Sequence, residues 1–315
     1  MRAISQEVLG GPDVLTIVEL DRPTLGPTDV LIRVHAAGVN PTDWLHRRTG
    51  LYLGEPPFVV GWDVSGTVES VGRGVTLHKP GDEVFGMLDY PRGAGAYAEY
   101  VAGPSRNFVS KPAGIDHVRA AALPVVALTA WQALVDTADV QPGQRVLIHA
   151  AAGGVGHVAV QVAKALGAYV IGTASGPKRD FVLGLGADEV IDYTAADFAE
   201  TVRDVDVVLD AVGGEYGPRS LRTMRRGGTL VAIVFSHPGD MEAAAKERGV
   251  RLEYQTVEAD QAGMAAIARL VDEGLLRIEI EAVLPLEQAG EAQRLGETGR
   301  TTGKIVLSVA ATGRA

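Results

Sequence analysis

The sequence predicts an α/β protein that joins a mostly β, barrel-type domain to a domain built on a doubly wound parallel sheet. Two observations lead to this prediction. Residues 1–115 contain short alternating apolar runs separated by clusters of Gly and Pro, as in twisted β-barrels. From residue 117 onward, helical patterns alternate with short runs rich in Val, Ile and Leu, and such βαβ alternation produces a parallel sheet. The 315 residues are enough for two domains.

The individual elements follow from the period of the apolar residues. In the first part, strands are expected at 14–19, 30–36, 66–71, 83–87 and 96–101. In the second part, helices are expected at 117–137, 154–167, 177–185 and 217–225, alternating with strands at 146–150, 169–173, 189–191, 206–210 and 229–234. Two more helical patterns cover 241–249 and 262–276, and the tail from 280 to 309 predicts a strand, a helix and a last strand.

Composition excludes several classes of function. The chain contains no cysteine, which rules out disulfides, thiolate zinc sites and cysteine nucleophiles. Its net charge of −10 argues against nucleic acid as a partner, because phosphate neutralisation drives that binding. No apolar run is long enough to span a membrane and no signal peptide is visible, so no membrane partner and a cytoplasmic location are expected.

The segment 145–175, RVLIHAAAGGVGHVAVQVAKALGAYVIGTAS, carries the most information about function. It predicts a strand, a tight turn with Gly153, Gly154, Val155 and Gly156, a helix and a second strand. Glycines in such a turn let the backbone approach a pyrophosphate, which binds at the positive end of the helix that follows. The first glycine of the usual pattern is alanine here, and an ordinary β-α turn packed through glycine is the alternative.

The residues after the second strand indicate which dinucleotide would bind. Sites for NAD place Asp or Glu there to hold the ribose hydroxyls. In this chain the first acid is Asp180, and Ser175, Lys178 and Arg179 occupy the region instead. A hydroxyl and two cations suit a 2′-phosphate, which a carboxylate would repel. The pattern therefore predicts NADPH as the cofactor, with a solvated helix start as the alternative.

Segments spread over nearly the whole chain match one family in that family's order. They are AAGVNPTDW (36–44), GWDVSGTVESVG (61–72), PGDEVFG (80–86), GAYAEYV (95–101), ALPVVALTAWQAL (122–134), the glycine-turn segment (142–168), LGADEVIDY (185–193), DVVLDAVGG (206–214) and TTGKIVL (301–307). As a set they resemble the medium-chain dehydrogenase/reductase superfamily, within it the zinc-free quinone oxidoreductase branch. The resemblance implies a GroES-like β-barrel-type catalytic domain from residues 1–116 and 280–315. It also implies an NADP-binding Rossmann domain from 117–279, with the active site in the cleft.

The chain departs from the zinc-dependent branch of this family at its metal ligands. Asn40 stands where zinc alcohol dehydrogenases have a cysteine, and Gly61, Trp62 and Asp63 replace their GHE motif. The four-cysteine structural zinc loop is also missing, so no metal site is expected. Without this Lewis acid, conjugate reduction of a quinone or enone fits, because the substrate's carbonyl delocalises the incoming charge and a hydrogen-bond donor stabilises it.

The resemblance also implies roles for individual residues. Asn40 would lie beside the nicotinamide and substrate, with its amide donating to the developing oxyanion, although an asparagine before proline also fits a turn. Tyr52 would line the cleft or relay a proton. Trp44 fits an aromatic wall or a packing role equally. The remaining residues implied to bind the cofactor are Thr129, Tyr193, Val212, Ile233, Phe235 and Lys304.

Together, the residues and the resemblance predict an NADPH-dependent, zinc-independent reductase of quinones or α,β-unsaturated carbonyls. An enoyl or 2-alkenal reductase of the same fold is one alternative, and a non-catalytic NADPH-binding regulator is another. The family resemblance implies a homodimer formed through an edge strand of the parallel sheet, for which residues 228–235 and 254–257 are the expected source.

Overall fold

The computed structural model describes residues 1–309, which form two compact units. The first unit comprises Met1–Leu128, Glu258–Glu273 and the residues from Ile278 onward, and the second comprises Thr129–Val257 and Gly274–Arg277. The division falls inside helix α3 (Pro124–Trp131). The functional domain boundaries predicted from the sequence stay a prediction.

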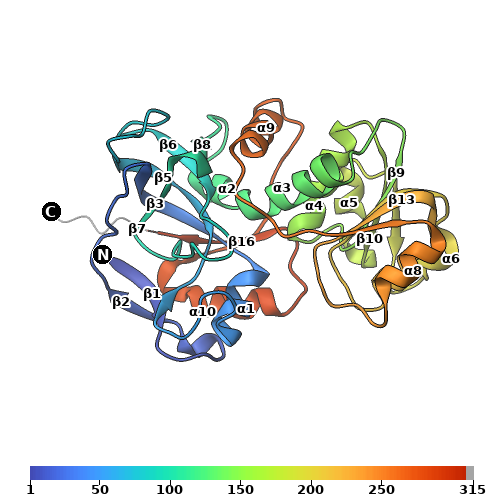
Figure 1. The fold of residues 1–315 in the computed structure, drawn as a ribbon, viewed down its shortest axis with the longest axis horizontal. Helices are drawn as coiled ribbons and strands as arrows, with labels where there is room; N and C mark the ends of the chain where they lie inside the picture. The colour runs from blue at the N-terminus through green and yellow to red at the C-terminus, as the bar shows by residue number, and fades with distance from the viewer. Residues whose placement is uncertain (310–315) are drawn as a thin grey trace. The chain divides into compact units, whose positions relative to one another are not determined.

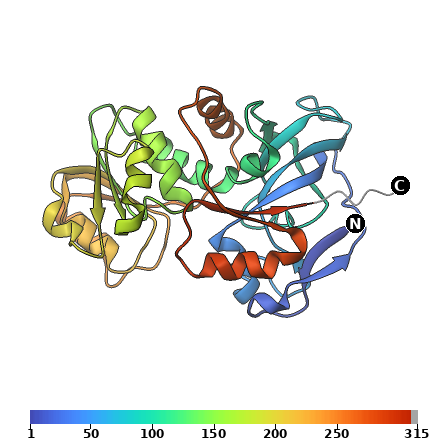
Figure 2. The ribbon, with the colours of Figure 1, turned by 180° about the vertical axis from the view of Figure 1, so that it is seen from behind.

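The first unit is built mainly from β-strands (Figure 1). One sheet has the order β15-β16-β3-β5-β6-β8, with β7 paired to β3, and a smaller sheet has the order β2-β1-β4. Figure 2 shows the C-terminal strand β16, in red, among the N-terminal strands, and Val306 pairs with Gly38 of β3. The strands are β1 (Arg2–Gln6), β2 (Thr16–Glu19), β3 (Asp29–Val39), β4 (Phe58–Val59), β5 (Asp63–Val71), β6 (Glu83–Met87), β7 (Tyr100–Pro104), β8 (Phe108–Ser110), β15 (Ile280–Pro285) and β16 (Lys304–Ser308).

Helix α1 (Pro41–Thr49) carries several polar side chains of the first unit, and its ends are set by local chemistry. Asp43 Oδ2 accepts the backbone amide of Asn40 at 2.8 Å, and Pro41 occupies the first turn, where no amide donor is needed. Gly50 ends the helix with a φ of 64°, which glycine adopts without strain. The other helical elements of this unit are η1 (Pro12–Val14), η2 (Ser105–Asn107), α2 (His117–Ala121), α9 (Gln261–Asp272), η5 (Leu286–Gln288) and α10 (Ala289–Glu297).

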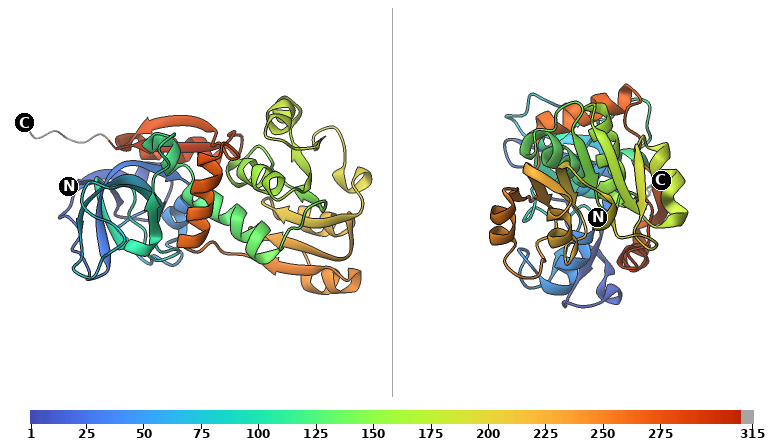
Figure 3. Two further views of the ribbon diagram at one scale, coloured as in Figure 1. Left: turned by 90° about the horizontal axis from the view of Figure 1, so that it is seen from above. Right: turned by 90° about the vertical axis from the view of Figure 1, so that its right-hand side faces the viewer.

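The second unit contains a six-stranded, all-parallel sheet with the order β11-β10-β9-β12-β13-β14 (Figure 3). Its strands are β9 (Arg145–Ile148), β10 (Tyr169–Ala174), β11 (Glu189–Asp192), β12 (Val205–Asp210), β13 (Met224–Ala232) and β14 (Arg251–Tyr254). Its helical elements are the π-helical η3 (Gln132–Thr137), α4 (Gly154–Ala165), η4 (Gly176–Lys178), α5 (Arg179–Gly184), α6 (Phe198–Thr201), α7 (Tyr216–Leu221) and α8 (Met241–Arg248).

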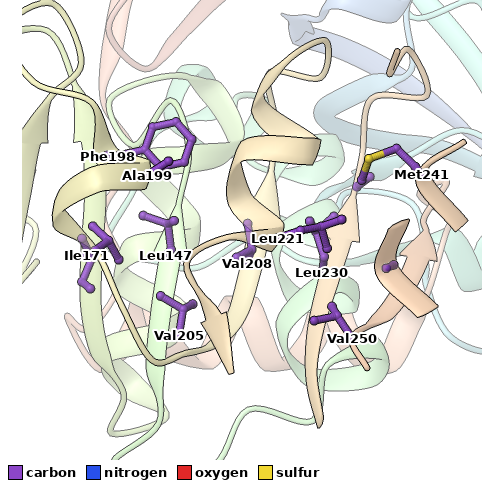
Figure 4. Close-up of a cluster of buried hydrophobic side chains, with 13 residues drawn as sticks. Leu147, Ile171, Phe198, Ala199, Val205, Val208, Leu221, Leu230, Met241 and Val250 are labelled. Carbon is purple, nitrogen blue, oxygen red and sulfur yellow. The ribbon is translucent and has the colours of Figure 1, made fainter. Parts of the chain in front are cut away.

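A buried apolar cluster fixes this sheet against its helices (Figure 4). Neighbouring parallel strands contribute branched side chains, and helices contribute larger ones, as expected for strands covered on both faces. The cluster includes Leu147, Ile171, Val208 and Leu230 from the strands and Phe198 and Met241 from helices α6 and α8.

The structure differs from the sequence-based elements at a few points. The strand expected at 96–101 starts only at Tyr100, because the preceding residues bond to other segments, as when Tyr97 accepts the amide of Ile4. The helix expected at 117–137 is divided into α2, α3 and η3, since Pro124 lacks an amide hydrogen and starts a new helix. The helix expected at 217–225 ends at Leu221, and β13 begins at Met224.

The open edge of the parallel sheet differs from the expectation for residues 228–235, although it includes Tyr254 of the expected 254–257. Strand β13, which contains most of the segment 228–235, is paired on both sides, with β12 and with β14. The free edge on this side is β14, which ends at Tyr254. Within residues 1–309, no helix is long and apolar enough to cross a bilayer.

Candidate functional site

Most residues predicted to bind the cofactor follow directly after parallel strands of the second unit. Because the carboxyl ends of parallel strands meet at one edge of a sheet, the structure brings these residues to that edge. The strand order reverses between β9 and β12, the point where open parallel sheets bind ligands. The predicted residues found here are Gly153, Gly154, Val155 and Gly156 after β9, Ser175 after β10, Tyr193 after β11, Val212 after β12, and Ile233 and Phe235 after β13.

The turn after β9 has the geometry of a phosphate cradle. Gly153 is the N-cap of α4 and provides no side-chain cap for the amides of its first turn. A Cβ on Gly156 would lie 2.1 Å from the carbonyl oxygen of Ala150, so only glycine allows this close approach of helix and turn. The uncapped first-turn amides and the helix dipole suit an anion, and the turn therefore fits the pyrophosphate of a dinucleotide.

The predicted 2′-phosphate residues lie in the short segment after β10. Ser175 precedes η4, Lys178 ends it, and Arg179 begins α5 with its side chain 55% exposed. The guanidinium of Arg179 lies 3.8 Å from the Asp180 carboxylate, a weak exposed pair. The segment thus carries two cations, and its assignment to a 2′-phosphate stays a prediction.

Asp192, at the end of β11, is a residue of this region that sequence reasoning missed. Its register partner is Ala174 at the end of β10, and a Cβ on Gly176 would lie 2.6 Å from its Oδ2. Hydrogen bonds from the Thr194 hydroxyl and amide hold the pKa of Asp192 below its usual range. The signal was available, because parallel pairing of two consecutive βαβ strands brings the two strand ends together.

The ends of β12 and β13 are connected through a buried carboxylate. Asp210 Oδ1 accepts the amides of Val212 and Gly213, each at 2.9 Å, and its Oδ2 lies 3.0 Å from His237 Nε2. Phe235 is 59% exposed beside a depression of about 380 Å³ that His237, Met241 and Tyr254 also line. The Asp210 carboxylate therefore fixes the backbone conformation at Val212.

Thr129 and Tyr193 complete the predicted residues of the second unit. Thr129 lies on α3 and is buried, and its carbonyl accepts a hydrogen bond of 3.4 Å from Gln255 Nε2. Tyr193 is 49% exposed after β11. Their roles toward a cofactor stay predictions.

In the first unit, two predicted residues meet in a buried polar cluster. Lys304 Nζ donates to Asn40 Oδ1 at 2.5 Å and to the Val39 carbonyl at 2.7 Å, and it lies 3.5 Å from Asp63 Oδ2. Asn40 Nδ2 donates to the same Asp63 oxygen at 2.8 Å. With Asn40 only 1% exposed, its amide orients Lys304 and Asp63 in this structure.

The cluster continues to Asp43 and Tyr97. Tyr97 Oη donates to Asp43 Oδ2 at 2.7 Å, while Asp43 Oδ1 is buried without a hydrogen-bond partner in the described part of the chain. Burial raises the pKa of Asp43 to about 7 and also raises the pKa of Asp63. Burial lowers the pKa of Lys304, although the nearby carboxylates oppose this change. The cluster therefore holds buried ionisable groups whose protonation depends on pH.

A second group in the first unit surrounds His46 of α1. The Tyr52, Trp62 and Tyr90 rings lie 5.9, 4.9 and 6.2 Å from the His46 ring, and Trp62 and Tyr90 meet edge to face. Tyr52 is 59% exposed and has a φ of 62°, which is rare for a residue with a side chain. Thr42 Oγ1 donates to Tyr90 Oη at 3.2 Å. We refer to Thr42, His46, Tyr52, Trp62 and Tyr90 as the His46 group.

From this group, the sequence predicted a functional role only for Tyr52, and Trp62 was noted only as the replacement for the histidine of the GHE motif. Thr42 lies within the motif AAGVNPTDW (36–44), but nothing in the sequence connects Tyr90, 48 positions further on, with α1. Trp44 instead packs against α10, where a Cβ on Gly296 would lie 2.7 Å from its ring. Within residues 1–309, no group of three or more His, Asp or Glu side chains is arranged to hold a metal ion.

Comparisons with known families and proteins show which family the chain belongs to. Residues 26–113 match the family model described as an alcohol dehydrogenase GroES-like domain, and residues 185–307 match the one described as a zinc-binding dehydrogenase. The chain is 32% identical to human quinone oxidoreductase over 326 residues, covering 98% of this chain and 97% of the relative. It is 35% identical to 2-haloacrylate reductase from a Burkholderia species, covering 95% and 96%.

The chain also matches part of a much larger protein. It is 36% identical over 301 residues to a pikromycin polyketide synthase component of Streptomyces venezuelae, covering 90% of this chain and 8% of that protein.

Solved structures agree with these sequence matches. The quinone oxidoreductase of Coxiella burnetii superposes with a TM-score of 0.93 at 36% identity, covering 98% of this chain and 99% of the other. The Escherichia coli quinone oxidoreductase complexed with NADPH gives a TM-score of 0.89 at 29% identity, covering 98% and 100%. The chain thus contains a GroES-like N-terminal domain and a parallel six-stranded sheet of the Rossmann type. The chain belongs to the medium-chain dehydrogenase/reductase superfamily, in its quinone oxidoreductase branch.

Proposed function

We propose that this protein is an NADPH-dependent reductase of quinones or α,β-unsaturated carbonyl compounds. The observation that carries the proposal is the uncapped glycine turn at the start of α4, placed where the order of the parallel strands reverses. The family supports it, since relatives named quinone oxidoreductase match over almost the whole chain and one of them was solved with NADPH.

The residues of the second unit would bind the cofactor and fix its orientation. Backbone amides of Gly154, Val155 and Gly156 would hold the pyrophosphate, and Lys178 with Arg179 would hold a 2′-phosphate. Asp192 opposes that preference, because its carboxylate stays ionised beside the same segment. When bound, NADPH supplies a hydride equivalent to an electrophilic carbon.

In the first unit, the chain's own polar groups would handle the charge that develops on the substrate oxygen. Asn40 is held by Lys304 and Asp63, so its orientation is fixed before any substrate arrives. Tyr52, 59% exposed, would line the substrate site. Preorganised donors of this kind stabilise an oxyanion without reorganisation during the reaction.

The choice between quinone and conjugated carbonyl substrates stays open within this proposal. The 2-haloacrylate reductase of a Burkholderia species supports the second class, because a haloacrylate has a carbon–carbon double bond conjugated to a carboxyl group.

The test is NADPH oxidation with a panel of benzoquinones and naphthoquinones beside a panel of enals and enones. We expect turnover with at least one class, and faster turnover with NADPH than with NADH. NADPH binding without turnover in either panel would refute the reductase and favour a regulatory binding protein.

A further inference from the structure

Hydrogen bonds connect His46, Thr42 and Tyr90 in a chain, and the donor of each bond can be assigned. His46 Nδ1 lies 2.7 Å from the Thr42 carbonyl oxygen, and because a carbonyl only accepts, Nδ1 carries the hydrogen. Thr42 Oγ1 lies 3.1 Å from the same nitrogen, so it accepts from this N–H and keeps its own hydrogen for Tyr90. The hydroxyl of Tyr90 therefore accepts the hydrogen bond from Thr42, and no acceptor within residues 1–309 takes its own hydrogen.

The surroundings hold this arrangement in place. His46 and Trp62 are fully buried, whereas Tyr90 is half-buried. The Tyr90 ring meets Trp62 at 67° and His46 at 80°, which are favourable edge-to-face contacts. The tyrosine ring is thus fixed by packing while its hydroxyl is oriented by Thr42.

The protonation of the group is consistent with a neutral donor. Burial raises the pKa of Tyr90, and the nearby Tyr52 hydroxyl and Asp43 raise it further, against the opposing hydrogen bond from Thr42. Burial lowers the pKa of His46, so the imidazole is neutral near pH 7. The Tyr52 and Tyr90 rings both contact the His46 ring, with centroids 5.9 and 6.2 Å from its centroid.

We propose that Tyr90 is the hydrogen-bond donor to the substrate oxygen in the reduction proposed above, and that Thr42 and His46 are positioning residues for its hydroxyl. The substrate oxyanion would then accept hydrogen bonds from Tyr90 as well as from the predicted residues Asn40 and Tyr52. The hydrogen bond from the neutral Tyr90 O–H becomes stronger as negative charge develops on the substrate oxygen. This inference rests on the proposed function for the identity of the substrate, whereas the ability of Tyr90 to donate a hydrogen bond to an oxyanion does not depend on it.

The first test uses kinetics of Tyr90→Phe, which keeps the ring contacts and removes the hydroxyl. We expect kcat and kcat/KM to fall together for an enone, by about 10–100-fold, with a smaller loss for a quinone, which is intrinsically more reactive. Thr42→Val is expected to give a smaller fall, and Thr42→Ser to restore most of it. Tyr100→Phe is the matched control, since its hydroxyl is bound by Arg22 on the surface of the same unit.

The second test measures binding without turnover. We compare 4-nitrophenolate, an oxyanion, with neutral 4-nitroanisole by absorbance titration. Tyr90→Phe is expected to weaken phenolate binding by at least about tenfold, the effect of one charge-assisted hydrogen bond, and to leave nitroanisole binding unchanged.

The outcomes separate this inference from the proposed function. If the wild-type protein reduces neither substrate class, the proposed function fails, and the phenolate comparison alone decides the role of Tyr90. If a folded Tyr90→Phe protein keeps wild-type phenolate affinity, or if no phenolate binds to the wild type, the inference is overturned. Should Tyr90→Phe not fold, the contrast between Thr42→Val and Thr42→Ser decides, and equal kinetics in that pair overturn it.

Discussion

Replacing Asp43 by asparagine should change how stability depends on pH. Burial raises the pKa of Asp43 in the folded chain to about 7, from 3.8 for an unperturbed aspartate. Between these values the unfolded chain has lost the proton and the folded chain has kept it, so unfolding becomes easier as pH rises from about 4 to about 7. In an Asp43→Asn variant this contribution disappears.

The size of the effect follows from the shift. A difference of about three pKa units corresponds to roughly 4 kcal/mol in the free energy of unfolding, at about 1.4 kcal/mol per pH unit. The asparagine oxygen can still accept from the Asn40 amide and Tyr97 Oη. Its NH2 group would take the position of Oδ1, which has no partner, at a cost of about 1–3 kcal/mol that does not vary with pH.

The assay is urea unfolding followed by tryptophan fluorescence at pH values between 5 and 8. Relative to wild type, the variant should gain about 2 kcal/mol of stability between pH 5 and pH 7, because the slope falls off as Asp43 becomes half ionised near pH 7. Asp180→Asn, where the side chain is 96% exposed, makes the same chemical change on the surface and serves as the control. If the difference between Asp43→Asn and wild type is the same at both ends of the pH range, the assigned ionisation is wrong.

Four further predictions concern the cofactor, the site and assembly. Lys178→Ala combined with Arg179→Ala should remove the preference for NADPH over NADH in fluorescence titrations, whereas Asp192→Asn should increase it, because a repelling carboxylate is lost; an unchanged preference in both would contradict the 2′-phosphate assignment. Gly156→Ala should weaken binding of both cofactors and lower the melting temperature, since its Cβ meets a backbone carbonyl at 2.1 Å; normal cofactor affinity would argue against the cradle. Asn40→Ala should reduce kcat and kcat/KM together by up to about 100-fold with unchanged NADPH affinity, and an intact kcat would leave Asn40 only as a residue that orients Lys304 and Asp63. Light scattering should find a homodimer, joined through the free edge of β14, and a monomer at micromolar concentration would contradict this.

Elements of the fold were predictable from the sequence where residues close together in the chain determine them. The strand–turn–helix around Gly153 and Gly156 was predicted closely, because glycine spacing and apolar period act within a few residues. The break at Pro124 was also visible in the sequence, since proline cannot continue a helix, but the long apolar pattern outweighed it. The strand expected at 96–101 is shifted to Tyr100–Pro104, because Tyr97 and Ala98 bond to Ile4 and Ala3 of β1, and no local pattern reveals this contact.

Residues of the candidate site were predictable from the sequence only where they lie together in one short segment. The contact between Lys304 and Asn40 joins residues 264 positions apart, and only the family resemblance put both near one site. Their burial and their hydrogen bonds to each other had no sequence signal. Tyr90 was missed for the same reason, since its connection to Thr42 exists only after the sheet of the first unit has formed.

The position of β16 has a consequence for how the chain reaches this structure during synthesis. Strand β3 is made early, but one of its neighbours, β16, ends at Ser308, so the main sheet of the first unit stays incomplete until almost the whole described chain has been synthesised. The second unit is nearly continuous in sequence, from Thr129 to Val257, and its sheet needs no later strand. Until Lys304 emerges, Asp43 and Asp63 lack the cation beside which they are buried. The N-terminal unit is therefore the last to mature, and a ribosome that stalls before residue 304 would release a chain with a finished second unit and an open, charged first one.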